Sequence, residues 1–226
     1  MATHSYFWSI KHRYLLFALL LTGMAKPLLM ANRATRKVKF HKAVGTGYGK
    51  NFTLFDANPW MWGLILVAPE EEAEEISNSF LISIWRKISR REDFYLLKAI
   101  ASHGKWSARE PFEVDETLKN WQGEVAAITR ARIKARHTIR FYLSVPPVSR
   151  TLHQSNGVIS AWGIGEAPIG LQGTFSHWSN QRQLREFAYN SEEHKKAIED
   201  TEKIGWYSEE LFARFAVIST QQKNFK

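Results

Sequence analysis

Apolar residues along the chain recur in short segments that are rich in aromatic and β-branched side chains, as β-strands are. Several of these segments alternate apolar and polar residues with the two-residue period of a strand. Turn residues or longer segments with helical spacing separate them. Eight strands are therefore predicted: His4–Ile10, Val38–Val44, Trp60–Ala68, Phe94–Ser102, Glu124–Ile133, Val158–Ile164, Gln172–Trp178 and Leu211–Thr220.

Helical patterns lie between the predicted strands. Arg13–Gly23 is predicted as a helix, with a boundary soon after it at Pro27. Pro69–Glu75 opens another helix, because proline and acidic residues suit a helix N-terminus. Ala135–Leu143 is predicted to be helical, and Ser179–Ile204 is predicted as a long amphipathic helix with a polar cap at its start.

The N-terminal helix has a second interpretation. Three basic residues, Lys11 to Arg13, precede the apolar run Tyr14–Met24, which is the order of a signal peptide. The run is shorter than the ~20 residues that a membrane-spanning helix needs. No clean cleavage site follows it, and a predicted strand precedes it. We therefore favour a buried helix of the fold, with a signal peptide as the alternative.

The order strand, helix, strand, strand, helix, strand occurs twice, and this is the split βαβ pattern of the ferredoxin-like fold. The halves also resemble each other locally, since Lys39–Gly47 is similar to Ser160–Gly165. Chance similarity is the alternative explanation. The sequence predicts an α+β fold in which two fused ferredoxin-like repeats, residues 1–120 and 121–226, form one compact unit, a dimeric-type α+β barrel.

Composition narrows the chemistry. The chain has 226 residues, of which 13% are aromatic, and this suits a large apolar interior or an apolar ligand pocket. It has no cysteine, which excludes disulfides, thiolate-ligated haem and iron–sulfur clusters held by this chain. The net charge of +9 suits an anionic membrane surface or an acidic partner protein. No nucleic-acid motif accompanies the scattered basic residues, so nucleic acid is not a predicted partner.

A few ionisable residues are candidates for chemistry. His194 lies on the apolar stripe of the last helix, where it suits either a haem-iron ligand or a hydrogen-bonded core histidine. His137 and His153 are alternative ligands, whereas His177 alternates with apolar residues and is expected to face solvent. Arg214 stands among apolar residues of the last strand, and a charge there needs a carboxylate or a bound anion as partner.

Several blocks of the chain resemble the spheroidene monooxygenase family, the acyclic carotenoid 2-ketolases. They keep their order along nearly the whole chain, and together they are specific. The blocks are Gly23–Leu29, Gly45–Phe52, Gly104–Phe112, Ala127–Ile133, Val145–Ser149, Gly163–Pro168, Phe187–His194, Trp206–Tyr207 and Glu209–Phe215.

The resemblance implies a haem-dependent monooxygenase that uses molecular oxygen to introduce a keto group at the end of an acyclic carotenoid such as spheroidene. It implies a ferredoxin-type electron donor and a cytoplasmic protein with peripheral contact to a membrane. Carried onto this sequence, it makes His194 the iron ligand. Arg214 and Arg130 would hold haem propionates or orient oxygen, and Trp206 and Tyr207 would line the pocket. A cofactor-free monooxygenase or a carrier of an apolar ligand on the same barrel is the alternative function.

Overall fold

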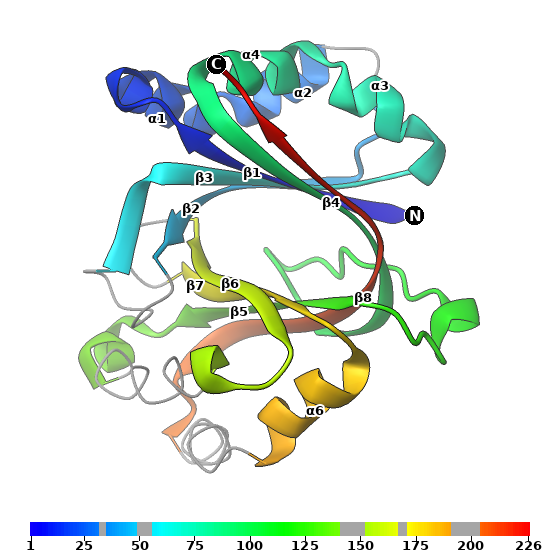
Figure 1. The fold of residues 1–226 in the computed structure, drawn as a ribbon. Coiled ribbons are helices and arrows are strands. Elements are labelled where there is room, and N and C mark those ends of the chain that lie inside the picture. The colour runs from blue at the N-terminus through cyan, green and yellow to red at the C-terminus, as the bar shows by residue number, and fades with distance from the viewer. Residues whose placement is uncertain (32–34, 49–55, 141–151, 167–170, 191–203) are drawn as a thin grey trace.

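The protein forms a closed barrel of eight antiparallel strands in a computed structural model, which describes residues 1–31, 35–48, 56–140, 152–166, 171–190 and 204–226 (Figure 1). The strands are β1 (Ala2–Ile10), β2 (Phe40–Gly47), β3 (Ala57–Ala68), β4 (Ser89–Gly104), β5 (Val125–Ile133), β6 (Val158–Gly165), β7 (Leu171–Trp178) and β8 (Tyr207–Asn224). All eight predicted strands are confirmed, and most are longer than predicted.

The barrel closes in the order β1-β3-β2-β6-β7-β5-β8-β4, and β4 returns to β1. Within each half the strands follow the same order: fourth, first, third, second. The halves meet along a long β4–β8 ladder and a short β2–β6 contact at Gly45↔Gly165 and Thr46↔Ile164. The α+β barrel is therefore confirmed. Its interpretation as two fused ferredoxin-like repeats is consistent with the strand order and stays a prediction, as does the division at residue 120.

Helices cover the two halves of the barrel on opposite sides (Figure 1). On the first half lie η1 (His12–Tyr14), α1 (Leu15–Gly23), α2 (Ala25–Ala31), η4 (Glu70–Glu72), α3 (Ala73–Ser77) and α4 (Phe80–Ile88). The short η5 (Glu116–Leu118) precedes β5, η6 (Ala135–His137) follows it, and α6 (Gln181–Asn190) packs against the second half. The predicted helices at 13–23 and from Pro69 are confirmed, as is the start of the one at 179. The helix predicted at 179–204 leaves the described part of the chain after residue 190. The helix predicted at 135–143 leaves it after residue 140.

The helix boundary predicted near Pro27 is confirmed. α1 ends at Gly23, and α2 begins at Ala25 with Pro27 in its first turn, where a proline costs no intrahelical hydrogen bond. Gly45 and Gly47 pair with β3 inside β2, and the connection to β3 starts beyond them.

Aromatic and branched side chains from all eight strands fill the barrel interior. Phe7 lies at its centre, with ring centroids of Trp162 and Phe175 each 4.9 Å from its own. Phe7 pairs with Gly63 of β3, where an added Cβ would come within 2.8 Å of the Phe7 ring. This glycine therefore makes room for the central ring, since the interior has no space for a second side chain there.

The outer faces of the two halves differ in side-chain size. The first half presents large residues such as Tyr6, Trp8 and Leu64, and these pack against α1 to α4 in a second core. The second half combines large residues such as Trp178 with a set of small ones. One register row across its outer face runs Ala161, Ser176, Ala127, Arg214.

The N-terminal helix belongs to the fold, because β1 precedes it and pairs with both β3 and β4. The prediction that it is buried holds for only one side. Ala18 and Leu21 are buried, whereas Leu16, Phe17 and Leu20 are exposed. No single helix among the described residues is long and apolar enough to cross a membrane; the pair 12–23 and 25–31, bent by 66°, passes such a test by length and composition alone.

Candidate functional site

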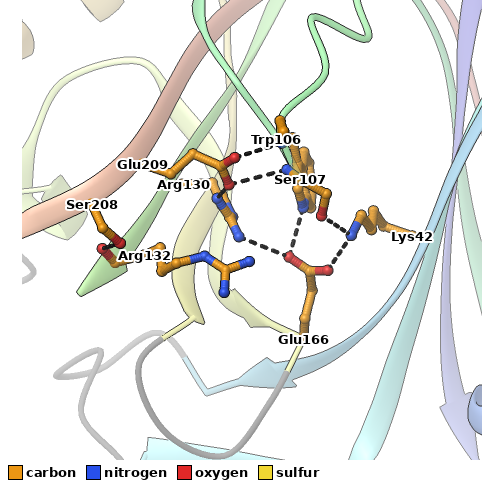
Figure 2. Close-up of polar contacts among 9 residues, drawn as sticks. Lys42, Trp106, Ser107, Arg130, Arg132, Glu166, Ser208 and Glu209 are labelled. Carbon is orange, nitrogen blue, oxygen red and sulfur yellow. Dashed lines mark hydrogen bonds and ion pairs between the residues drawn. The ribbon is translucent and has the colours of Figure 1, made fainter. Parts of the chain in front are cut away.

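Four charged side chains meet inside one end of the barrel (Figure 2). They are Lys42 of β2, Arg130 of β5, Glu166 just after β6, and Glu209 of β8. Arg130 is the centre of this cluster, and its side chain is only 3% exposed. It forms ion pairs with both carboxylates, to Glu166 over 3.3 Å and to Glu209. Two cations thus balance two carboxylates, as burial of charge requires.

Glu166 accepts hydrogen bonds from two strands of the barrel wall, β2 and β5, and from the segment that follows β4. Its Oε1 accepts from the indole N–H of Trp106 at 2.6 Å and from Arg130. Its Oε2 pairs with Lys42, whose ammonium also donates to the Ser107 hydroxyl at 2.6 Å. The alternation of β6 accounts for this position: Trp162 and Ile164 face the interior, so the next inward residue after them is Glu166.

A strained turn holds Glu209. Ser107 and Ala108 have positive φ angles of 54° and 59°, which non-glycine residues rarely adopt. This conformation points their two consecutive N–H groups at the Glu209 carboxylate, at 3.0 and 2.6 Å. Burial alone would raise the pKa of Glu209, but these N–H groups and the Arg130 guanidinium outweigh it and lower the pKa. Glu209 is therefore a fixed anion.

The cluster joins four of the blocks that carry the family resemblance. Trp106 lies in Gly104–Phe112, Arg130 in Ala127–Ile133, Glu166 in Gly163–Pro168 and Glu209 in Glu209–Phe215. Arg130 is the only one of these residues predicted from the sequence as a site residue; its neighbours Glu166, Trp106 and Lys42 carry no local sequence signal that would have identified them. Chemically, the cluster has no spare charge and no group poised to move a proton. It fixes four strands and the 104–112 segment relative to one another at this end of the barrel.

A second polar group lies inside the other end of the barrel. His177 of β7 is buried, so the expectation that it faces solvent was wrong; the alternation that places Phe175 inside also places His177 inside. Its Nε2 lies 2.9 Å from a Glu124 oxygen, and its ring packs edge-on against Tyr95 at 5.4 Å. Burial lowers the pKa of His177, with Glu124 acting in the opposite direction. The imidazole is therefore neutral at pH 7.

Arg214 and Arg130 do not line the same site. Leu211, Ala213 and Phe215 of β8 face the barrel interior, so Arg214 lies on the outer face, on the side of α6. There it pairs with Ala127, next to the small residues Ala161 and Ser176. Apolar side chains of Leu184 and Phe187 from α6 pack near this floor of small residues. The two arginines predicted to act together thus face opposite sides of one sheet.

The other predicted site residues are distributed as follows. His194 lies outside the described residues, four positions after the last described residue of α6. Trp206 is buried beside the end of β5, where its carbonyl accepts from the Lys134 N–H at 2.8 Å, and Tyr207 is half-buried opposite Ile133. Within the described part of the chain, no group of three or more His, Asp or Glu residues is placed to hold a metal ion.

The alternative histidine ligands lie in two different connections of the second half. His137 follows β5, and its Nε2 accepts from the Arg136 side chain at 3.0 Å. Burial, together with the cations Arg136 and Lys134, lowers the pKa of His137. His153 is exposed and lies ahead of β6.

No family model matches this chain. Three curated proteins are similar to it in sequence. The chain is 31% identical over 189 residues to the spheroidene monooxygenase of Rhodobacter capsulatus, covering 82% of this chain and 78% of the relative. The chain belongs to the spheroidene monooxygenase family. The members of Rubrivivax gelatinosus (30% identity, 81% of this chain, 70% of the relative) and Cereibacter sphaeroides (34%, 81% of this chain) agree. The chain spans 57% of the length of the Cereibacter protein.

This member of the spheroidene monooxygenase family is similar in fold to solved structures. Two aldoxime dehydratase structures, one in complex with butyraldoxime, superpose with TM-scores of 0.59 and 0.60. They cover 98% and 99% of this chain and 81% and 84% of their own, at 12% and 10% identity. At this identity the likeness concerns the barrel architecture alone.

Proposed function

We propose that this protein is a haem-dependent monooxygenase that introduces a keto group at the end of an acyclic carotenoid such as spheroidene. Membership of the spheroidene monooxygenase family supports the reaction class and the substrate. Haem, molecular oxygen and a ferredoxin-type electron donor are what the family resemblance implies. The aromatic-rich interior and the absence of cysteine are compatible with a histidine-ligated haem.

The observation that carries the proposal is the floor on the outer face of the second half. Ala161, Ser176 and Ala127 lie in one register row and have side chains of only one or two heavy atoms. Arg214 stands at the end of that row, and Phe187 and Trp178 supply apolar ring surface beside it. Ala127 and Ser176 are buried, so a flat, apolar group with acidic substituents at its edge, as haem is, would lie between this floor and the side chains that cover it, with the cation at its edge.

The residues around this floor would hold the cofactor in distinct ways. His194, on the chain just beyond α6, would ligate the iron. Arg214 would pair with a propionate, because a guanidinium binds a carboxylate through two parallel hydrogen bonds. Trp206 and Tyr207 lie toward the other end of β8 from Arg214, and they would line the pocket away from the floor. When bound, haem supplies the activation of oxygen, and the protein places the substrate and controls access of water.

Arg130 would act from the inside of the same sheet. Its guanidinium is engaged by two carboxylates, so it is suited to position β5 and β8 relative to each other. Those two strands carry Ala127 and Arg214 on their outer side. Arg130 is therefore proposed as a positioning residue for the cofactor floor.

The basic surface would bind an acidic electron donor, and the protein is proposed to act in the cytoplasm at a membrane surface.

The test is the absorption spectrum of the protein expressed with a haem precursor, together with four variants. His194→Ala and Arg214→Gln should lose or weaken the Soret band through the ligand and the propionate partner. Ala161→Phe should abolish it by filling the floor, whereas Ala161→Ser keeps the small side chain and should retain it. Denaturant unfolding of each variant without haem is the control for folding.

The outcomes separate the elements of the proposal. A Soret band that persists in His194→Ala moves the iron ligand to His137 or His153. A band unaffected by Ala161→Phe refutes the floor as the cofactor site. No band in the parent protein refutes haem dependence, and oxygen-dependent product formation would then separate a cofactor-free oxygenase from a carrier.

A further inference from the structure

The helical layer over the first half exposes an unusual number of apolar side chains. Leu16, Phe17, Leu19 and Leu20 of α1 point away from the barrel, and Leu16 is 80% exposed. Met24 and Met30 continue this surface into α2. α1 is apolar on all sides, but only Ala18 and Leu21 are buried, with Leu15 packed at the edge of the core beneath it. A helix of this composition is normally covered on every side, whereas no described residue covers its outer face.

A basic cavity adjoins this surface. It has a volume of about 520 Å³ and lies between α2, the start of β2 and the 104–112 segment. Four cations, Lys26, Arg36, Lys39 and Arg109, line it together with His41, and the described lining residues include no carboxylate. Leu29, Met30 and Val38 supply its apolar wall. Its composition therefore matches a ligand with an anionic head and an apolar body.

The cations of the cavity are available to an external anion. Within the described part of the chain, Lys26, Arg36 and Arg109 form no ion pair, and Lys39 has only the exposed Glu113 at 3.6 Å. Burial lowers the pKa of His41, and Lys42, Lys26 and Arg109 lower it further, which reflects the positive potential at the cavity. An anion bound there would relieve the mutual repulsion of these side chains.

We propose that α1, α2 and this basic cavity form the docking surface for an anionic phospholipid bilayer. The exposed apolar face of α1 would enter the headgroup region, and the cavity would take the phosphate of a lipid headgroup. Both features are carried by one continuous segment, because α2 follows α1 after a single residue. An apolar helix face with flanking cations is the composition of helices that lie in the membrane interface. The inference rests on the membrane contact proposed above and deepens it, because it names the surface of the protein and the lipid chemistry that would make the contact.

The experiment is flotation of the full chain with vesicles of pure phosphatidylcholine or with 30% phosphatidylglycerol. We expect binding to the anionic vesicles that is at least tenfold tighter than to the neutral ones and that weakens with salt. Lys26→Gln with Arg36→Gln should weaken it about 20- to 30-fold, from the value of two cations near an anionic surface. Leu16→Ser with Leu20→Ser should weaken it about tenfold or more.

Matched controls sit elsewhere on the molecule. Ile139→Ser with Ile159→Ser removes two comparably exposed apolar side chains, and Lys119→Gln with Arg182→Gln removes two exposed cations. Both control variants should bind vesicles like the parent. Equal binding to neutral vesicles, or equal losses in the controls, would overturn the proposal. The proposal would also be overturned if Leu16→Ser with Leu20→Ser converted a dimer into a monomer and left vesicle binding intact. A second copy of the chain would then be the partner that covers α1. Vesicle binding needs no turnover, so it stands or fails independently of the oxygenase proposal.

Discussion

Replacing Arg130 by methionine should destabilise the protein far more than the loss of an ordinary ion pair. The guanidinium is 3% exposed and lies between Glu166 and Glu209, each 15% exposed. Removing one member of a buried ion cluster typically costs about 3–5 kcal/mol, because the remaining charges stay desolvated and unpaired. Both carboxylates keep other donors, Lys42 and Trp106 for Glu166 and two backbone N–H groups for Glu209. We therefore expect the lower end, about 3 kcal/mol.

The chain offers a control with the same chemistry at the surface. Arg182 and Glu186 form an i,i+4 pair at 2.9 Å on α6, and the Arg182 side chain is 87% exposed. Arg182→Met should change the free energy of unfolding by only about 0.5 kcal/mol, since solvent screens exposed pairs. Both variants are compared by urea unfolding at pH 7.

The pH dependence tests the cause. The folded pKa of Glu209 is below its ordinary value, so its stabilisation is present above the ordinary pKa of a glutamate and is lost as the pH falls through the folded value. The difference between parent and Arg130→Met should therefore be complete at pH 7 and shrink towards pH 4. A difference below about 1 kcal/mol at pH 7, or one that does not change with pH, would refute the buried-charge argument.

Two further predictions concern the parts of the barrel away from this cluster. His4 is fully buried, and burial lowers its pKa from 6.5 to about 4. The folded protein therefore favours the neutral imidazole. Because the unfolded chain takes up a proton near pH 6.5, the protein should lose stability as the pH falls below 6.5. The stability of His4→Leu relative to the parent should rise by about 3 kcal/mol between pH 7 and pH 4, and parallel unfolding curves at the two pH values would contradict this. Gly104 has a φ of +86°, and an added Cβ would lie 2.2 Å from the Glu210 carbonyl oxygen, so Gly104→Ala should cost about 2 kcal/mol or more. Gly23→Ala is the control, because an added Cβ there has no atom within 4 Å. Thermal unfolding should show it to be neutral or stabilising by up to about 1 kcal/mol. Similar losses of stability in both variants would disprove the role of φ at Gly104.

The sequence determined the elements and the class of the fold. Strand segments such as Trp60–Ala68 and Gln172–Trp178 carry their own signal, because β-branched and aromatic residues bounded by turn residues favour a strand locally. The repeated order of elements then favours one α+β barrel. The family resemblance was likewise available from the residues alone, and the curated relatives confirm it.

Tertiary structure decided which side chains face each other. Glu166 and Trp106 are 60 residues apart in sequence, and only closure of the barrel places the indole N–H 2.6 Å from the carboxylate. The faces of Arg130 and Arg214 depend on the side-chain alternation of two different strands and on their register, which a local pattern does not fix. The same holds for α1, whose apolar residues are alike in sequence, whereas its packing on the barrel buries Ala18 and exposes Leu16. Secondary-structure propensity depends on residues that are close in sequence. The burial of a side chain and its contacts depend on residues that are distant in sequence and that the fold places next to it.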